Sequence, residues 1–346
     1  MKKIKLGLPA LMLLLFVLLS CADKTQTISV LQFNIWNEGG SVEHGFEGIV
    51  DNILNVDPDM VAFCEIRNYD GVDFIDRIMN ALQQKGSHYY GQSSSSTGII
   101  SKFPLVEQTV IYPIKNDAGS ITKARIDVHG KTVVLYAAHL DYKHYSCYLP
   151  RGYDGSTWAK IEEPITDADS ILAQGRKSYR LDAVKVFIEE SKQEIAKGNF
   201  VIIAGDFNEP SHLDWTDETK NLWDHNGAVV EWEVSKLLAD NGFMDSYREM
   251  YPDVVNYPGF TFPSDNKDAE LSKLSWAPES DERDRIDFIY YFPLKDISLK
   301  ESVVVGPSKS VYDGQRKEET GMDKFLLPVD PWPTDHKGLF SIFVIK

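Results

Sequence analysis

The stretch Val201-Ile202-Ile203-Ala204-Gly205-Asp206-Phe207-Asn208-Glu209-Pro210 decides the fold. Its apolar start has the length and composition of a buried strand. Its end places a carboxylate and an amide where further apolar side chains would be expected. Side chains alternate with a period of two along a strand, so Asp206 and Asn208 are predicted to project to the same side at its carboxyl end. Asp and Asn also end strands as ordinary turn formers, so this stretch alone leaves both interpretations open.

Five further segments repeat the pattern of an apolar strand with a polar side chain at or near one end. Three end in a polar group, a fourth places an aspartate among apolar and aromatic residues, and the fifth precedes the last predicted strand, 338–345. The polar residues are Asn34, Glu65, His139, Asp287 and the pair Asp335-His336. Titratable groups gathered at the ends of buried strands are typical of a catalytic cleft between packed sheets.

In this order along the chain, these residues resemble the signature of the endonuclease/exonuclease/phosphatase superfamily, which has the deoxyribonuclease I-like fold. The matching motifs are Phe33-Asn34-Ile35, Glu65, Ala137-Ala138-His139-Leu140, Gly205-Asp206-Phe207-Asn208, Arg285-Ile286-Asp287-Phe288 and Asp335-His336. The resemblance runs from Val30 to the C-terminus and is specific for the superfamily, but not for a substrate. It implies an α+β fold of two packed mixed β-sheets flanked by helices, a four-layer sandwich, and metal-assisted hydrolysis of a phosphoester.

The resemblance also implies how a metal would be held. Glu65 is expected to be the main ligand of Mg²⁺ or Mn²⁺, which prefer carboxylate and amide oxygens. Asn34 is expected to be a second ligand or an orienting group. Asp335 is expected to complete the surroundings of the metal.

The remaining matched residues are expected to carry the reaction. The resemblance implies that Asp206 positions or deprotonates the attacking water and that Asn208 binds a non-bridging phosphate oxygen. His336, paired with Asp287, is expected to donate to the phosphoryl group as its charge builds. His139 is expected to stabilise charge or protonate the leaving oxygen.

Two positions depart from members of the apurinic-endonuclease type. Trp36 stands where those proteins have an aspartate, and His139 stands where they have a tyrosine. Both differences favour the secreted nuclease, sphingomyelinase and sugar- or lipid-phosphatase branches over DNA repair.

The rest of the chain alternates predicted strands and helices within one domain, 28–346. Helices are predicted over 45–56, 72–84, 169–195 and 230–239. Two aromatic-rich segments, 141–169 and 211–229, follow predicted site residues directly and are interpreted as insertions. Their aromatic rings are predicted either to form a substrate-recognition wall or to pack against the body of the domain.

The N-terminus has the features of an export signal. Residues 1–20 carry three lysines followed by an apolar run too short to span a bilayer comfortably. The sequence Leu18-Leu19-Ser20-Cys21 resembles a bacterial lipoprotein cleavage box, with a tether over 21–27. A plain signal peptide or an uncleaved anchor is the alternative. We therefore expect an exported, monomeric protein of the cell envelope, held in a membrane, with the outer membrane favoured, by a lipid on Cys21.

The charge of the chain bears on its substrate. It has 36 Lys and Arg against 52 Asp and Glu, a net charge of −16, and 33 basic residues would remain without the three signal lysines, giving −19. Such a balance argues against tight binding to long nucleic acid. It favours a phosphorylated small molecule or a lipid head group over nucleic acid as the substrate. A secreted endonuclease and a non-catalytic surface-binding protein remain the competing interpretations.

Overall fold

The computed structural model describes residues 26–116 and 119–346. The predicted signal peptide, the predicted lipidation site Cys21 and most of the predicted tether lie outside these residues. Strand β1 begins at Gln26, so the last two residues of the predicted tether already pair with the C-terminal strand. In the part of the chain that is described, no helix is long and apolar enough to cross a bilayer.

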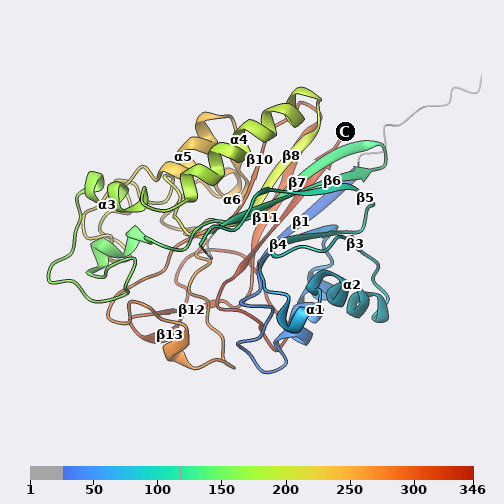
Figure 1. Cartoon of the computed structure of the whole chain (residues 1–346). Helices are drawn as coiled ribbons and strands as arrows, with labels where there is room; N and C mark the ends of the chain where they lie inside the picture. Colours follow the sequence, from blue (N-terminus) through green and yellow to red (C-terminus); the bar gives the residue numbers. More distant parts are fainter. Residues whose placement is uncertain (1–25, 117–118) are drawn as a thin grey trace, which may run out of the picture.

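Two mixed sheets form the centre of the molecule (Figure 1). Sheet A contains, in spatial order, β14 (Phe325–Leu326), β11 (Ile297–Val305), β15 (Gly338–Ile345), β1 (Gln26–Asn34), β2 (Met60–Ile66), β4 (Ser96–Ser101) and β3 (Tyr90–Gly91). Sheet B contains β5 (Leu105–Tyr112), β6 (Ser120–Val128), β7 (Lys131–His139), β8 (Phe200–Asp206), β10 (Asp287–Tyr291) and β9 (Met244–Asp245). A separate hairpin pairs β12 (Lys309–Tyr312) with β13 (Gln315–Glu318).

Helices cover the outer faces of both sheets (Figure 1). The α-helices are α1 (Gly45–Val56), α2 (Phe74–Gln84), α3 (Ala168–Gly175), α4 (Arg180–Ala196), α5 (Glu233–Asp240) and α6 (Ser246–Met250). Short 3₁₀ segments are η1 (Tyr69–Gly71), η2 (Ser146–Arg151) and η3 (Leu271–Lys273). Helices α1 and α2 pack on sheet A, and α4 and α5 pack on sheet B.

Three apolar layers hold these four structural layers together. The central layer lies between the sheets and contains side chains such as Val30, Leu135 and Ile202. The outer layers join sheet A to α1 and α2, and sheet B to α4 and α5. The predicted four-layer α+β sandwich is therefore confirmed, because each sheet buries both of its faces.

The helix predictions were accurate for α1 and α2, which pack on sheet A, and partly wrong for the helices that follow β7. Helix α1 has the predicted bounds, and α2 begins at Phe74 because Asp73 caps it by accepting from Asp76 N. The predicted helix 169–195 is wrong, since α3 ends at Gly175 and α4 starts at Arg180. Ser178 Oγ donates to Gly175 O, and Asp141 Oδ2 accepts from Tyr179 N, so side-chain bonds replace the helical ones at the break.

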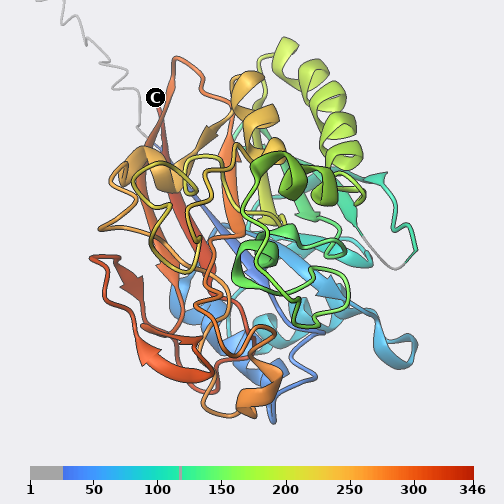
Figure 2. The same ribbon diagram turned by 90° about the vertical axis from the view of Figure 1, so that its left-hand side faces the viewer.

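The long loops gather at one end of the sandwich. Figure 2 shows the segments that follow β7, β8 and β9 crowded there, together with those that precede β10 and β15. Both predicted insertions belong to this end. The candidate site residues lie at the strand ends on this side of the sandwich or in the loops directly next to them.

Candidate active site

The site is the polar end of the apolar layer between the sheets. On β1, Ile28 and Val30 point into this layer, and the strand period places Gln32 and Asn34 on the same face. On β7 the series Val133, Leu135, Ala137 ends in His139. On β8 it runs through Ile202 and Ala204 to Asp206. Each strand therefore carries apolar side chains into the core and a polar side chain at its end.

Strand register then brings three of these side chains together. Asp206 is the direct partner of His139 in the parallel pair β7–β8 and of Asp287 in the antiparallel pair β8–β10. Gly205 allows this arrangement, because a Cβ at that position would lie 1.7 Å from Ala138 O of the neighbouring strand. The glycine of the Gly-Asp-Phe-Asn motif is therefore a packing requirement of sheet B.

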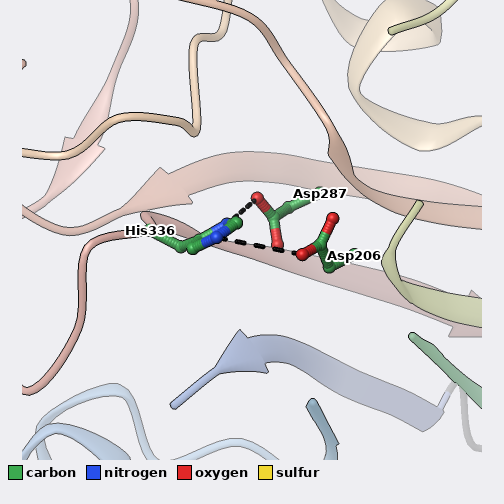
Figure 3. A group of neighbouring side chains, drawn as sticks. All are labelled: Asp206, Asp287 and His336. Carbon is green, nitrogen blue, oxygen red and sulfur yellow. Dashed lines mark hydrogen bonds and ion pairs between the residues drawn. The ribbon is translucent and has the colours of Figure 1, made fainter. Parts of the chain in front are cut away.

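Asp287 and His336 form a buried pair (Figure 3). Asp287 Oδ2 lies 2.9 Å from His336 Nδ1, and Asp287 Oδ1 accepts from Gln32 Nε2 at 2.6 Å. His336 Nε2 lies 3.8 Å from Asp206 Oδ2. Burial alone would lower the pKa of His336, but Asp287 and Asp206 outweigh it and raise that pKa above its ordinary value. The predicted Asp–His pair is present.

Asp206 is the centre of the hydrogen-bond network. Its Oδ2 accepts from Asn34 Nδ2 at 3.0 Å, and its Oδ1 accepts from the backbone N of Asn208 at 2.9 Å. His139 Nε2 lies 3.8 Å from Oδ2, the same distance as His336. Burial, opposed by the positive charge of His336, raises the pKa of Asp206 above its ordinary value. Burial lowers the pKa of His139.

Strand alternation does not direct Asp206 and Asn208 to the same side, contrary to the prediction from the sequence, although both line one cavity. Strand β8 ends at Asp206, and Asn208 lies beyond it with φ 49°. The tight turn at Asn208, and not strand alternation, directs its side chain. Asn208 Nδ2 donates to Leu140 O at 3.1 Å and approaches Asp206 Oδ2 at 3.3 Å.

Glu65 reaches the site through a β-bulge. The pairing of β2 with β4 shifts between Cys64 and Ile66, and Glu65 has φ 69°. A bulge of this kind redirects a side chain and stores local strain, which is common beside active sites. Glu65 Oε1 accepts from Asn34 Nδ2 at 3.2 Å, and Oε2 accepts from the backbone N of Asn37 at 3.0 Å.

The oxygen-rich side of the site fits a divalent metal. Glu65 and Asp335 are carboxylates that line the same cavity. Burial raises the pKa of Asp335, because a carboxylate that is removed from water loses the hydration that stabilises its charge. Asn34 directs its amide nitrogen toward Glu65 and Asp206, and its oxygen accepts from Trp36 N, so the geometry favours the orienting role for Asn34.

A second group of possible ligands consists of Asp206, Asp287 and His336, whose ligand atoms lie within 4.8 Å of one another. Both ring nitrogens of His336 face carboxylates, and the raised pKa of His336 favours a proton there. A protonated imidazole has no lone pair to offer a metal, so His336 could join this group as a ligand only after losing that proton.

A cavity of about 320 Å³ opens over these groups. The predicted residues that line it are Glu65, His139, Asp206, Asn208, Asp335 and His336. Asn34 and Asp287 lie behind them, fully buried, and contact the cavity through Asp206 and His336. All eight predicted site residues thus belong to one connected site.

The two predicted insertions behave differently. Tyr142, Tyr145, Tyr148 and Trp158 of 141–169 line the cavity, and the last three also pack in one apolar cluster with Trp215, so this segment shows features of both interpretations. In 211–229, Trp215 is buried and stacks on His225, so this segment packs against the body of the protein.

Sequence reasoning missed several neighbours of the site. Gln32 is fully buried in β1, and a glutamine between Leu31 and Phe33 was the available signal. Phe262, Trp276 and Arg67 also line the cavity and come from loops without a recognisable motif. Arg180 forms a buried salt bridge with Glu209 Oε2 at 3.3 Å.

Two packed sheets with carboxylates, amides and imidazoles at the strand ends define a deoxyribonuclease I-like fold. The sequence profile of the Endonuclease/Exonuclease/phosphatase family matches residues 31–336, and the chain belongs to this family. An uncharacterized protein of Caenorhabditis elegans is 30% identical over 293 residues, which cover 81% of this chain and 85% of the relative.

Two solved structures illustrate the shared fold. The human nocturnin catalytic domain with bound sulfate anion matches with a TM-score of 0.52 and 14% identity, over 94% of this chain and 98% of that chain. TDP2 from Caenorhabditis elegans matches with a TM-score of 0.51 and 16% identity, over 92% of this chain and 75% of that chain. Identities this low establish a common fold and leave the substrate open.

Proposed function

We propose that this protein is a divalent-metal-dependent phosphoesterase that hydrolyses a small phosphoester at the cell envelope. The observation that carries the proposal is the convergence of His139, His336 and Asn34 on the single oxygen Asp206 Oδ2. A buried carboxylate surrounded in this way is suited to hold and deprotonate a water beside a phosphoryl group.

In the proposed reaction Asp206 accepts the proton of the attacking water. The raised pKa of Asp206, about 8, makes its ionised form a stronger base than an exposed aspartate, and this form predominates above pH about 8. Asn34 Nδ2 and the backbone N of Asn208 fix the orientation of the carboxylate. The water therefore meets a base whose position is set before the substrate binds.

His336 and His139 have different roles in the proposed reaction. The raised pKa of His336 keeps it protonated, so its Nε2 is suited to donate to a phosphoryl oxygen as negative charge builds. The lowered pKa of His139 keeps it neutral, which favours hydrogen bonding to the leaving oxygen, and that oxygen takes its proton from solvent water as its bond to phosphorus breaks. Asp287 holds the proton on His336 Nδ1 and fixes the ring.

Glu65, with Asp335 nearby, would hold a Mg²⁺ or Mn²⁺ ion, and Asn34 would orient Glu65. Such an ion, when bound, would neutralise phosphate oxygens and polarise the phosphorus centre. Arg67 Nη2 lies 3.8 Å from Glu65 Oε2 and lines the cavity. It adds a fixed positive charge on the same side.

The dimensions of the site support a small substrate. A volume of about 320 Å³ lies at the lower end of the range for small-molecule pockets. The net charge of −16 opposes binding of a polyanion. A secreted endonuclease is the competing proposal, and DNA is therefore included in the test.

We also propose that the protein is exported and lipid-anchored at Cys21. The lysines, the short apolar run and Cys21 of the N-terminal sequence support this. Strand β1 starts at Gln26 and ends in the site at Asn34, and nine strand residues span about 27 Å. A lipid tether before β1 would therefore place the membrane at one end of the strand and the catalytic cavity at the other end. This arrangement favours a soluble phosphoester as the substrate over a lipid head group in the membrane that holds the protein.

The test uses the full-length protein, stripped of metal, with and without added Mg²⁺. The substrates are 4-nitrophenyl phosphate, bis(4-nitrophenyl) phosphate, inositol phosphates, sphingomyelin vesicles, and single-stranded and duplex DNA. We expect metal-dependent hydrolysis that falls by about 10²–10⁴-fold in Asp206→Asn. The matched control is Asp217→Asn, whose side chain is 85% exposed and lies outside the cavity.

The outcomes separate the competing functions. Preference for DNA would replace the small-phosphoester proposal by the nuclease. A folded protein that binds neither Mg²⁺ nor any substrate would establish the non-catalytic interpretation. Hydrolysis that Asp206→Asn leaves intact would overturn the assignment of the site.

A further inference from the structure

One wall of the cavity is built from four aromatic rings that contact one another. Tyr145 and Tyr148 have ring centroids 4.9 Å apart, Tyr148 and Trp158 are 5.6 Å apart, and Trp158 and Trp276 are 5.6 Å apart. All four side chains line the cavity that contains Asp206 and His336. We refer to Tyr145, Tyr148, Trp158 and Trp276 as the aromatic wall.

The aromatic wall runs from the interior of the protein to solvent. Tyr145 and Tyr148 are buried, whereas Trp276 is 45% exposed. Trp158 has φ 61°, an unfavourable conformation for a bulky residue, and its backbone N donates to Asp154 O at 2.9 Å. Strain of this kind persists where surrounding contacts impose it, and it is concentrated at ligand-binding sites.

The aromatic wall carries no fixed charge of its own. Among the described residues that line the cavity, the groups that can carry a positive charge are Arg67, His139 and His336. Arg67 Nε donates to Asn37 Oδ1, and Arg67 also pairs with Glu65. The guanidinium of Arg67 therefore lies on the side of the cavity that is formed by Asn37 and Glu65. The part of a substrate that contacts the wall is therefore expected to carry no negative charge of its own.

A single buried carboxylate joins the two segments that form the wall. Glu282 Oε2 accepts from Tyr148 Oη at 2.6 Å, from Trp276 N at 3.0 Å and from Ala277 N at 3.0 Å. Its Oε1 accepts from Ser275 Oγ at 2.6 Å. Glu282 is fully buried, and it does not line the cavity. It therefore fixes residues of the 141–169 insertion against the loop that contains Trp276.

We propose that the aromatic wall is a subsite for a flat-faced ring without negative charge, attached to the phosphate of the substrate, and that Glu282 is the residue that positions this wall. This inference rests on the proposed phosphoesterase function, because it identifies the class of substrate that the same cavity accepts. Rings present flat apolar faces that stack on Trp and Tyr with little loss of conformational freedom. A flexible alkyl chain of equal area gains no such stacking.

The first experiment measures the hydrolysis of four phosphate monoesters, and of their methyl diesters, by the full-length protein in the presence of Mg²⁺. The esters are those of methanol, n-heptanol, cyclohexylmethanol and 2-naphthylmethanol, primary alcohols chosen to have similar acidity. We expect kcat/KM for a ring-bearing ester to exceed that for the methyl and heptyl esters by at least about tenfold. The two ring esters distinguish an aliphatic ring, such as a sugar, from an aromatic one.

Variants then assign this preference to the aromatic wall. Trp158→Ala and Trp276→Ala are expected to bring the ratio of ring to methyl kcat/KM close to one. Tyr90→Ala, at a tyrosine that is 41% exposed and outside the cavity, is the control and should leave the ratio unchanged. A heptyl ester that equals the ring esters would overturn the proposal, and so would a preference that survives Trp158→Ala.

The role of Glu282 has its own test. Glu282→Ala removes all four accepted hydrogen bonds and should lower the ring-to-methyl ratio, mainly through KM. Glu282→Gln keeps an oxygen for Tyr148 and the two backbone donors, and its amide can donate to Ser275 Oγ, so it should restore the ratio. If both variants keep the ratio of the natural protein, Glu282 does not position the wall.

A binding measurement separates failure of the inference from failure of the proposed function. Binding of 2-naphthylmethyl phosphate to Asp206→Asn is followed by quenching of tryptophan fluorescence, with and without Trp158→Ala. Saturable binding that needs Trp158, with no turnover of any ester by the natural protein, would retain the subsite and overturn the phosphoesterase. Turnover without ring preference would do the reverse, and the absence of both would overturn both.

Discussion

Asp287 Oδ2 lies 2.9 Å from His336 Nδ1, although 49 positions separate the two residues along the chain. Both groups are buried, and Asp287 is also fixed from behind by Gln32 Nε2 at 2.6 Å. Asp287 N donates to Thr261 Oγ1 at 3.2 Å, which fixes the backbone as well. The carboxylate therefore has one oxygen committed to Gln32 and one committed to the imidazole.

Asp287→Asn should lower hydrolysis by about 10²–10⁴-fold while the protein stays folded. An asparagine oxygen can still accept from Gln32, so the change is confined to the bond with His336. Asp287 raises the pKa of His336, so its removal lowers that pKa, and the proton needed for donation is lost at a lower pH. The alkaline limb of the pH–rate profile should therefore shift toward acid. An unchanged limb would exclude His336 as the protonated donor.

The positions of the site residues were predictable because of a regular feature of strands. Asn34, His139 and Asp206 each end an apolar strand, and alternation with a period of two puts them on the face that lines the central core. Their proximity then follows from strand order, which brings β7, β8 and β10 side by side.

Other features depend on tertiary contacts that a local pattern does not encode. The bulge at Glu65 arises from its pairing with β4, and Asn208 turns away from the strand that precedes it. The break between α3 and α4 depends on Asp141, which lies far from it in sequence. Glu282 has no motif at all, and its importance is visible only from the donors that surround it.

Glu65→Gln should raise the Mg²⁺ concentration needed for half-maximal activity, with partial rescue by excess Mg²⁺. The substitution removes one negative charge, while the amide oxygen can still accept a hydrogen bond. Titration of activity with Mg²⁺ measures the effect, and Glu43→Gln, whose side chain is 89% exposed, is the control. A normal Mg²⁺ requirement in Glu65→Gln would place the metal elsewhere, with the group of Asp206, Asp287 and His336 as the next candidate.

Arg285 precedes Asp287 in the matched motif, but its contacts are structural. Its guanidinium binds both oxygens of Asp214, at 3.0 and 2.9 Å, and Asp245 Oδ2 at 2.7 Å, with the side chain buried. Arg285→Met leaves buried carboxylates without this partner and should cost about 3–5 kcal/mol of unfolding free energy.

Arg176→Met is the matched comparison for Arg285→Met. Arg176 also binds a carboxylate through two nitrogens, that of Glu233, but its side chain is 51% exposed. Its loss should cost at most about 1 kcal/mol, because solvent screens exposed pairs. Urea unfolding followed by tryptophan fluorescence measures both variants, and equal losses would contradict the structural assignment of Arg285.

His225 should make the folded protein sensitive to acid. The imidazole is buried and stacks on Trp215 with centroids 3.7 Å apart, and burial, aided by the charge of Arg151, lowers its pKa to about 2. The unfolded chain takes up this proton below pH about 6.5, whereas the folded protein does not until pH about 2. Within that window each unit of acidification costs about 1.4 kcal/mol of stability. His225→Phe keeps a stacking ring and removes the titration, so its unfolding free energy relative to the natural protein should rise by about 2.3 kcal/mol between pH 6.5 and pH 4.5. Urea unfolding at the two pH values measures this change, and a difference independent of pH would show that His225 accepts its proton without loss of the fold.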